Sequence, residues 1–163
     1  MEPEGNSLIP PDLVVYSGDW DPYQEEIYRL YCETLRDGGL TFRGVRVMLQ
    51  RRPEYKGKPS SFWHLISEGE KEEERTPDLR RCERITWIAW VIRMSDSHPH
   101  ISSWENERKG DRRVVLWHEE ENYAVILSRR NGYYLLKTAY LATQHRAVGF
   151  RKEREEYFKS IQP

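Results

Sequence analysis

The sequence predicts an α+β fold in which N-terminal helices pack on a roughly four-stranded antiparallel sheet, followed by a C-terminal helix. Three observations lead to this prediction. Apolar residues recur at helical spacing in the first half of the chain, at about 20–37 and 76–94. Strand-like stretches separated by short turns follow at 114–117, 123–127 and 133–140. Helices that precede a run of strands are typical of the α+β class.

The first predicted helix, at about 20–37, carries both a start signal and a stop signal. Asp19 or Asp21 can cap its N-terminus, where side-chain oxygens accept hydrogen bonds from the first backbone N–H groups. The glycine pair at 38–39 ends it, because glycine tolerates the left-handed backbone that commonly follows a helix. The alternating residues 41–50 then predict a strand.

A second helix is predicted from the Thr-Pro-Asp sequence at 76–78 to Met94. The polar, turn-rich residues 95–111 after it predict a loop. Beyond the strands, we expect an irregular stretch at 144–149 and a charged final helix at 151–161.

The composition fits one folded domain. The chain has 163 residues, of which 37% are hydrophobic, and six tryptophans and ten tyrosines supply bulk for burial. This composition argues against disorder, which usually goes with few aromatic residues. Residues 1–18 contain prolines and lack periodicity, so we expect a loosely ordered N-terminal arm before a single domain at 19–163.

The sequence shows no membrane or export signal. No apolar run reaches about 18 residues, and no basic and then apolar segment opens the chain. We therefore expect a cytoplasmic protein without membrane contact. Cys32 and Cys82 do not form a CxxC pair, which predicts two buried thiols in place of a disulfide scaffold.

The charged residues are unevenly distributed, although the net charge is only −1. Residues 1–26 hold seven acidic and no basic side chains. Residues 36–58 hold seven basic against two acidic side chains, and residues 129–159 hold eight against three. Such blocks predict either a basic face for a polyanion or a solvated surface on which charges cluster by chance.

Several widely separated polar residues are candidates for chemistry. His64 lies inside the apolar run FWHLIS. Arg81 and Arg84 lie three residues apart on the second predicted helix, so both can project from one helix face. Thr138 and Tyr140 end the last predicted strand in YYLLKTAY, and their spacing of two puts both hydroxyls on one face.

These residue types together fit the cleavage of RNA without a metal. A histidine can remove the proton of a 2′-OH group near neutral pH. Arginines can hold a phosphate as charge builds on its oxygens, and hydroxyls can bind those oxygens or pass a proton to the leaving 5′-oxygen. The sequence shows no carboxylate cluster suited to two metal ions, so we expect no metal and no cofactor.

The segments FWHLIS, DLRRCERITWI and YAVILSRRNGYYLLKTAY resemble, in this order, the phage-encoded branch of the barnase–EndoU–colicin–RelE-like (BECR fold) ribonucleases. The resemblance covers about residues 40–158, and FWH and TAY are its most specific pieces. It implies helices against a four-stranded antiparallel sheet and a metal-independent endoribonuclease. It also implies a site formed by His64, an arginine of RRCER, Thr138 and Tyr140.

Within RRCER, Arg84 is slightly preferred, because Arg81 could instead pair with a neighbouring glutamate. The expected products carry a 2′,3′-cyclic phosphate and a 5′-OH. The resemblance further implies a toxin or phage–host conflict effector, with RNA (tRNA among the candidates) and a cognate inhibitor or immunity protein as partners. Five basic side chains are the candidates for holding the RNA backbone: Arg43, Arg46, Arg51, Arg52 and Lys137.

Other interpretations stay open from the sequence alone. His64 could simply fill space in a core. The two arginines could pair with neighbouring carboxylates on a solvated helix, and Thr138 and Tyr140 are both common strand residues. The alternative functions are a catalytically inactive RNA-binding or protein-interaction module of the same fold, and a structural phage or mobile-element protein.

Overall fold

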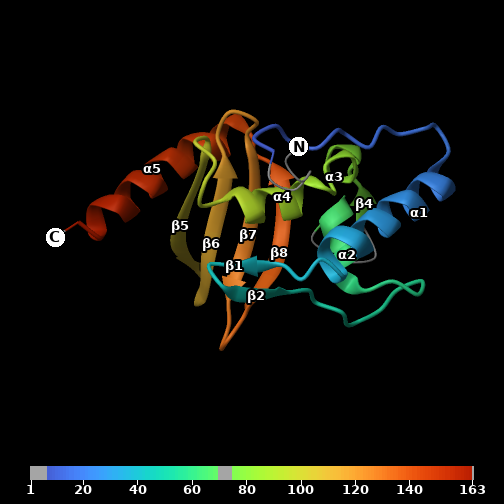
Figure 1. The fold of residues 1–163 in the computed structure, drawn as a ribbon, viewed down its shortest axis with the longest axis horizontal. Coiled ribbons are helices and arrows are strands. Elements are labelled where there is room, and N and C mark those ends of the chain that lie inside the picture. Colours follow the sequence, from blue (N-terminus) through green and yellow to red (C-terminus); the bar gives the residue numbers. More distant parts are fainter. Residues whose placement is uncertain (1–6, 70–74, 163) are drawn as a thin grey trace.

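The computed structural model describes residues 7–69 and 75–162 (Figure 1). The first half contains α1 (Trp20–Tyr31), the π-helix η2 (Cys32–Arg36), β1 (Thr41–Phe42), β2 (Val45–Met48), α2 (Ser60–Ile66), β3 (Ser67–Glu68) and β4 (Thr76–Pro77). The second half contains α3 (Leu79–Glu83), α4 (Trp87–Met94), β5 (Ile101–Arg108), β6 (Asp111–His118), β7 (Tyr123–Arg129), β8 (Tyr134–Leu141) and α5 (Gln144–Ser160).

The main sheet has six strands in the order β1-β2-β8-β7-β6-β5, and β3 and β4 form a separate pair. Neighbours in the main sheet are antiparallel except for β2 and β8, which run parallel. The predicted sheet of roughly four antiparallel strands is therefore wrong. The chain does combine helices with a sheet, and a helix, α5, follows the last strand.

Two segments account for this correction. The predicted loop at 95–111 contains β5, an edge strand that pairs along its whole length with β6. An edge strand can keep many polar side chains in solvent, so the composition of β5 resembles that of a loop. The predicted strand at 41–50 is in fact the β1–β2 hairpin, which turns at Arg43 and Gly44 with φ of 51° and 79°.

The predicted helix at 76–94 is divided into α3 and α4. Asp78 caps α3, since its Oδ1 accepts a hydrogen bond from the backbone N of Arg80 at 2.9 Å. Arg84 then leaves the helical conformation, with φ of −106° and ψ of 20°. This bend lets α3 contact β8 while α4 packs against β6 and β7.

The last helix begins earlier than predicted. Thr143 caps α5, because its Oγ1 accepts a hydrogen bond from the backbone N of Arg146 at 3.1 Å. The stretch 144–149, predicted to be irregular, is therefore the first part of α5. Gly149 weakens the helical pattern of this stretch in the sequence, because glycine is unfavourable inside a helix. In the folded chain, the cap and the packing of α5 outweigh the cost of one glycine.

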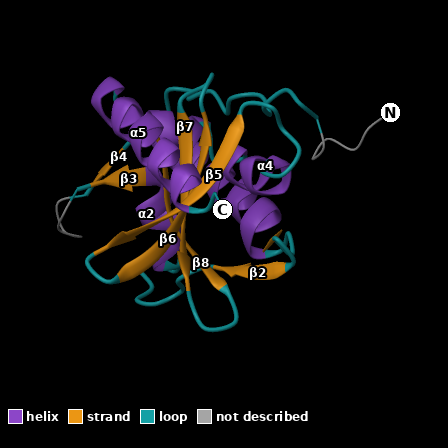
Figure 2. Cartoon of the chain, turned by 90° about the vertical axis from the view of Figure 1, so that its left-hand side faces the viewer, coloured by secondary structure: helices purple, strands orange, loops and turns teal. Residues whose placement is uncertain are grey.

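Different helices cover the two faces of the sheet (Figure 2). Residues of α1, α2 and α4 join strand residues such as Leu127 and Leu136 in the main core. On the opposite face, Phe150 of α5 packs with Trp104 and Trp117 in a second, smaller core. Because side chains alternate along a strand, each central strand contributes to both cores.

Residues 7–11 are held against α4 and His98 through their backbone carbonyls. The indole Nε1 of Trp90 donates to the carbonyl oxygen of Ser7, and that of Trp87 donates to Pro11, both at 2.7 Å. Nε2 of His98 is 2.8 Å from the carbonyl oxygen of Leu8. These contacts hold an extended segment by its backbone. The segment is therefore ordered even though its side chains show no helical or strand pattern.

None of the described helices is long and apolar enough to cross a membrane. Cys32 and Cys82 are both buried and reduced, as predicted. Burial raises the pKa of the Cys82 thiol to about 12, which keeps it protonated and unreactive at neutral pH.

Two glycines give a matched stability test. A Cβ on Gly38 would lie 2.3 Å from the backbone oxygen of Thr34, whereas a Cβ on Gly149 would meet no atom within 4 Å. We expect Gly38→Ala to destabilise the fold by about 1–3 kcal/mol through overpacking. Gly149→Ala should stabilise it by up to about 1 kcal/mol, because alanine is the better helix residue. Urea unfolding followed by tryptophan fluorescence measures both; equal effects would contradict the close approach at Gly38.

His118 predicts a pH dependence of stability. Its ring is only 3% exposed and stacks on Trp90. Burial lowers the pKa of His118, and the positive charges of His98 and His100 lower it further. Below about pH 6.5 the unfolded chain takes up this proton more readily than the folded chain. The contribution of neutral His118 to the free energy of unfolding is therefore complete above about pH 6.5. It is lost as the pH falls toward and through the pKa of His118 in the folded chain.

Urea unfolding at pH 7.5 and pH 5.5 checks this expectation. The loss of stability between the two pH values should be smaller in His118→Gln than in the unmutated protein, whatever the absolute stability of the variant. An equal loss in both proteins would contradict it.

Candidate functional site

A cavity of about 800 Å³ lies beside the sheet on the face that carries α5. Its walls come from the β3–β4 pair, α3, the strands β5, β6 and β8, and the start of α5. Five arginines line the cavity, which we call the arginine pocket: Arg80, Arg81, Arg108, Arg113 and Arg146.

A bulge in β8 turns Thr138 and Tyr140 toward this pocket. Leu136 pairs with Leu127 of β7, but the next pair is Thr138 with Ile126, so Lys137 is an extra residue in β8. Leu136 therefore points into the main core, whereas Thr138 and Tyr140 point to the opposite face. The predicted sharing of one face by the two hydroxyls is confirmed.

Arg81 of α3 meets both of these residues. Its Nη1 donates to Thr138 Oγ1 at 3.3 Å, and its guanidinium carbon lies 5.9 Å from the centre of the Tyr140 ring. The same Nη1 lies 3.2 Å from the carbonyl oxygen of Ser67. Its Nε lies 3.6 Å from Asp78 Oδ2. These contacts fix a guanidinium in the pocket wall with only 15% of the side chain exposed.

Arg84 lies elsewhere, although it is one turn away and equally buried, with 16% of its side chain exposed. Its guanidinium lies over the ring of Trp87 at 5.1 Å, and its Nη1 donates to the carbonyl oxygen of Arg80 at 3.1 Å. The glutamate partner foreseen for Arg81 belongs to Arg84, whose Nη1 is 3.5 Å from Glu83. Of the two arginines, the structure brings Arg81 to the hydroxyls.

His64 lies in α2 and is half-buried. Its backbone carbonyl oxygen is near Arg81 Nη1 at 3.4 Å and Arg75 Nη2 at 3.1 Å. The FWHLIS segment thus contacts Arg81 through its backbone. No histidine is found among the described residues that line the arginine pocket.

The sequence did not predict three of the pocket residues as part of the site: Arg108, Arg113 and Arg146. Arg108 and Arg146 fall in stretches predicted to be a loop and an irregular segment, so no face could be assigned to them. Arg113 comes just before the predicted strand at 114–117, and extending that alternation by one residue would have placed it on the face of Val115 and Trp117. Burial lowers the pKa of Arg113, and the charge of Arg108 adds to this effect.

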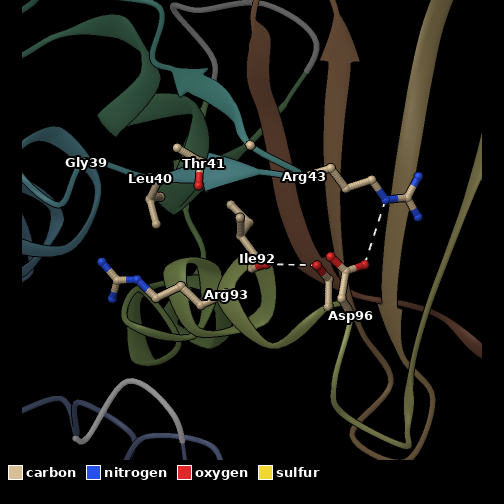
Figure 3. Close-up of a pocket in the computed structure, with 9 residues that line it drawn as sticks. Gly39, Leu40, Thr41, Arg43, Ile92, Arg93 and Asp96 are labelled. Carbon is tan, nitrogen blue, oxygen red and sulfur yellow. Dashed lines mark hydrogen bonds and ion pairs between the residues drawn. The ribbon is translucent and has the colours of Figure 1, made fainter.

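The five residues expected to hold RNA lie outside this pocket. Arg43 lies at the β1–β2 turn, where its Nη2 donates to Ser103 at 2.9 Å and its Nε lies 3.8 Å from Asp96. It lines a smaller cavity of about 390 Å³ (Figure 3). The others are all exposed, on β2, in the loop after it and at the β8 bulge: Arg46, Arg51, Arg52 and Lys137.

The arginine pocket is suited to anions. Glu68 and Asp78 are the carboxylates among its described lining residues, and Asp78 is occupied by the α3 cap and by Arg81. Arginine stays charged and presents a planar fork that matches phosphate oxygens. Fixed guanidiniums next to hydroxyls can therefore bind a phosphate group and stabilise charge on its oxygens.

Comparisons with known proteins add nothing to this picture: no family model matches the chain, and no curated protein or solved structure matches it either.

Proposed function

We propose that the chain is a metal-independent endoribonuclease whose reaction takes place in the arginine pocket. One observation carries the proposal. Arg81 Nη1 lies 3.3 Å from the Thr138 hydroxyl, and the Arg81 guanidinium carbon lies 5.9 Å from the centre of the Tyr140 ring, in a cavity lined by four further arginines. The RNA backbone has one negative phosphate per nucleotide, which gives such a cavity a matching ligand.

Arg81 and Thr138 would bind the non-bridging oxygens of the phosphate that is attacked. Negative charge builds on these oxygens as the 2′-oxygen adds to phosphorus. A fixed guanidinium therefore stabilises the transition state more than it stabilises the bound substrate. The carbonyl oxygens of His64 and Ser67 and the carboxylate of Asp78 hold Arg81 in place beforehand. The group therefore needs little reorganisation during the reaction.

Glu68 and Tyr140 are the pocket residues suited to proton transfer. The carboxylate of Glu68 would take the proton of the 2′-OH, while the Tyr140 hydroxyl would donate a proton to the leaving 5′-oxygen. A bond forms between the 2′-oxygen and phosphorus, and the bond from phosphorus to the 5′-oxygen breaks. The products are a 2′,3′-cyclic phosphate and a 5′-OH, as expected from the sequence.

A second candidate function is an RNA-binding module without cleavage. It is favoured by the location of His64, which is not among the described residues lining the pocket. Such a module would use the same guanidiniums to bind phosphates and would leave the RNA intact. In either case, the proposed setting is the cytoplasm, with RNA as ligand and an acidic inhibitor protein that covers the basic pocket.

The pair Arg81→Gln and Arg84→Gln tests the location of the site. We expect Arg81→Gln to lower the rate of RNA cleavage in EDTA by about 10²–10³-fold, as for the loss of one transition-state donor. Arg84→Gln removes an equally buried arginine one turn away and should cleave close to the unmutated rate. The assay follows a labelled oligoribonucleotide, with the 2′,3′-cyclic phosphate identified by mass spectrometry.

Two results would count against the proposal. If the unmutated protein binds RNA but leaves it uncut, the binding module is the correct function. If Arg84→Gln is inactive while Arg81→Gln remains active, the site lies elsewhere.

A second pair, Glu68→Gln and His64→Gln, identifies the general base. Removal of a general base costs typically about 10²–10⁴-fold in rate. We expect that loss in Glu68→Gln, whereas His64→Gln should keep the rate. The reverse result would return the role of base to His64.

A further inference from the structure

Resting on the proposed function, we infer that Arg113, with Arg108 and Arg146, forms a second phosphate subsite in the arginine pocket. The substrate is then a single RNA strand that places two phosphates in the pocket. One phosphate is held by Arg81 and Thr138, and the other is held by the second subsite.

One nitrogen of the Arg113 guanidinium has no hydrogen-bond acceptor among the described residues. Its Nε is buried and makes no hydrogen bond to any described residue. Burying a charged group without a partner is costly, and structures usually avoid it. A bound anion would supply the missing acceptor.

The carboxylates near Arg113 are already engaged. Asp111 Oδ1 accepts a hydrogen bond from Ser128 Oγ at 2.5 Å. Glu153 Oε1 accepts from the indole Nε1 of Trp104 at 2.6 Å and from Asn106 Nδ2 at 2.8 Å. Both carboxylates still attract the Arg113 guanidinium through space, but neither accepts a hydrogen bond from its buried Nε, which therefore lacks an acceptor among the described residues.

Like charges also converge on Arg113. The charge of Arg108 acts with burial to lower the pKa of Arg113, and Arg146 lines the same pocket from the first turn of α5. Three guanidiniums in one wall repel each other when no anion is present. The N-terminus of α5, a helix of 17 residues, adds partial positive charge on the same side.

The two subsites are separate but within reach of one short strand of RNA. Arg113 lies on β6 and Thr138 on β8, with β7 between them. The axes of β6 and β8 are therefore about 10 Å apart, twice the spacing of neighbouring strands, and Arg113 lies two residues along β6 from Val115, which is level with Thr138. Side chains that lean into one pocket shorten this separation, so neighbouring phosphates of an extended strand can occupy the two subsites.

The test measures binding without cleavage. The ligand is a 2′-O-methyl trinucleotide, which has two phosphates and no 2′-OH to attack. The matched ligand carries one neutral methylphosphonate linkage, so it keeps all three bases and loses one charge. In isothermal titration calorimetry at fixed salt, we expect the fully charged ligand to bind about tenfold more tightly, as for one charge-assisted phosphate contact.

Arg113→Gln should bring this affinity ratio close to one. Arg112→Gln is the matched control, because Arg112 is its exposed neighbour on β6 and does not line the pocket; it should keep the tenfold ratio. Arg108→Gln, which should lower the ratio in part, serves as a second variant if Arg113→Gln does not fold. Circular dichroism confirms the fold of each variant.

Equal affinities for the two ligands in the unmutated protein would overturn the second subsite while leaving the cleavage proposal intact. A nucleoside diphosphate that binds more tightly than the trinucleotide would also overturn the inference that the pocket holds two phosphates of an RNA strand. The two phosphates would then belong to one small molecule. If no trinucleotide binds and RNA is not cleaved, the proposed function itself fails.

Discussion

The extra residue at Lys137 in β8 is the constraint on which the candidate site depends. A strand sends alternate side chains to opposite faces, so a single inserted residue reverses the facing of every residue beyond it. Leu136 lies in the main core, and the bulge lets Thr138 and Tyr140 face the arginine pocket. Without it, two polar hydroxyls would point into the main core.

The polar backbone at the end of α2 is a second determinant of the pocket. The C-terminal carbonyls of a helix have no partners within the helix and carry partial negative charge. Arg81 and Arg75 donate to the carbonyl oxygens of His64 and Ser67, which satisfies these carbonyl groups. The same contacts hold Arg81 next to Thr138 of β8. Arg81 of α3 therefore joins the end of α2 to β8. The charge of the pocket comes from side chains, whereas its rigidity comes largely from backbone acceptors.

Part of the candidate site could be predicted from the sequence. Thr138 and Tyr140 were expected on one face, and Arg81 was one of two arginines expected near them. The slight preference for Arg84 differs from the structure, which brings Arg81 to the hydroxyls, because residues at i and i+3 share a helix face only while the helix continues. The helix breaks after Glu83, and Arg84 turns toward Trp87. Arg108 and Arg146 were out of reach because their segments were not assigned to regular structure, whereas Arg113 lies one residue before the predicted strand at 114–117.

The sequence by itself determined the α+β character, the N-terminal helix, the hydrophobic sheet strands and the buried thiols, because these follow from local periodicity and composition. Only the tertiary structure decided the six-stranded sheet, its parallel β2–β8 pair and the convergence of five arginines on one cavity. Edge-strand pairing, a one-residue bulge and a helix break each depend on contacts between distant segments. Such contacts leave no local pattern in the chain, so their effects become visible only when the segments meet.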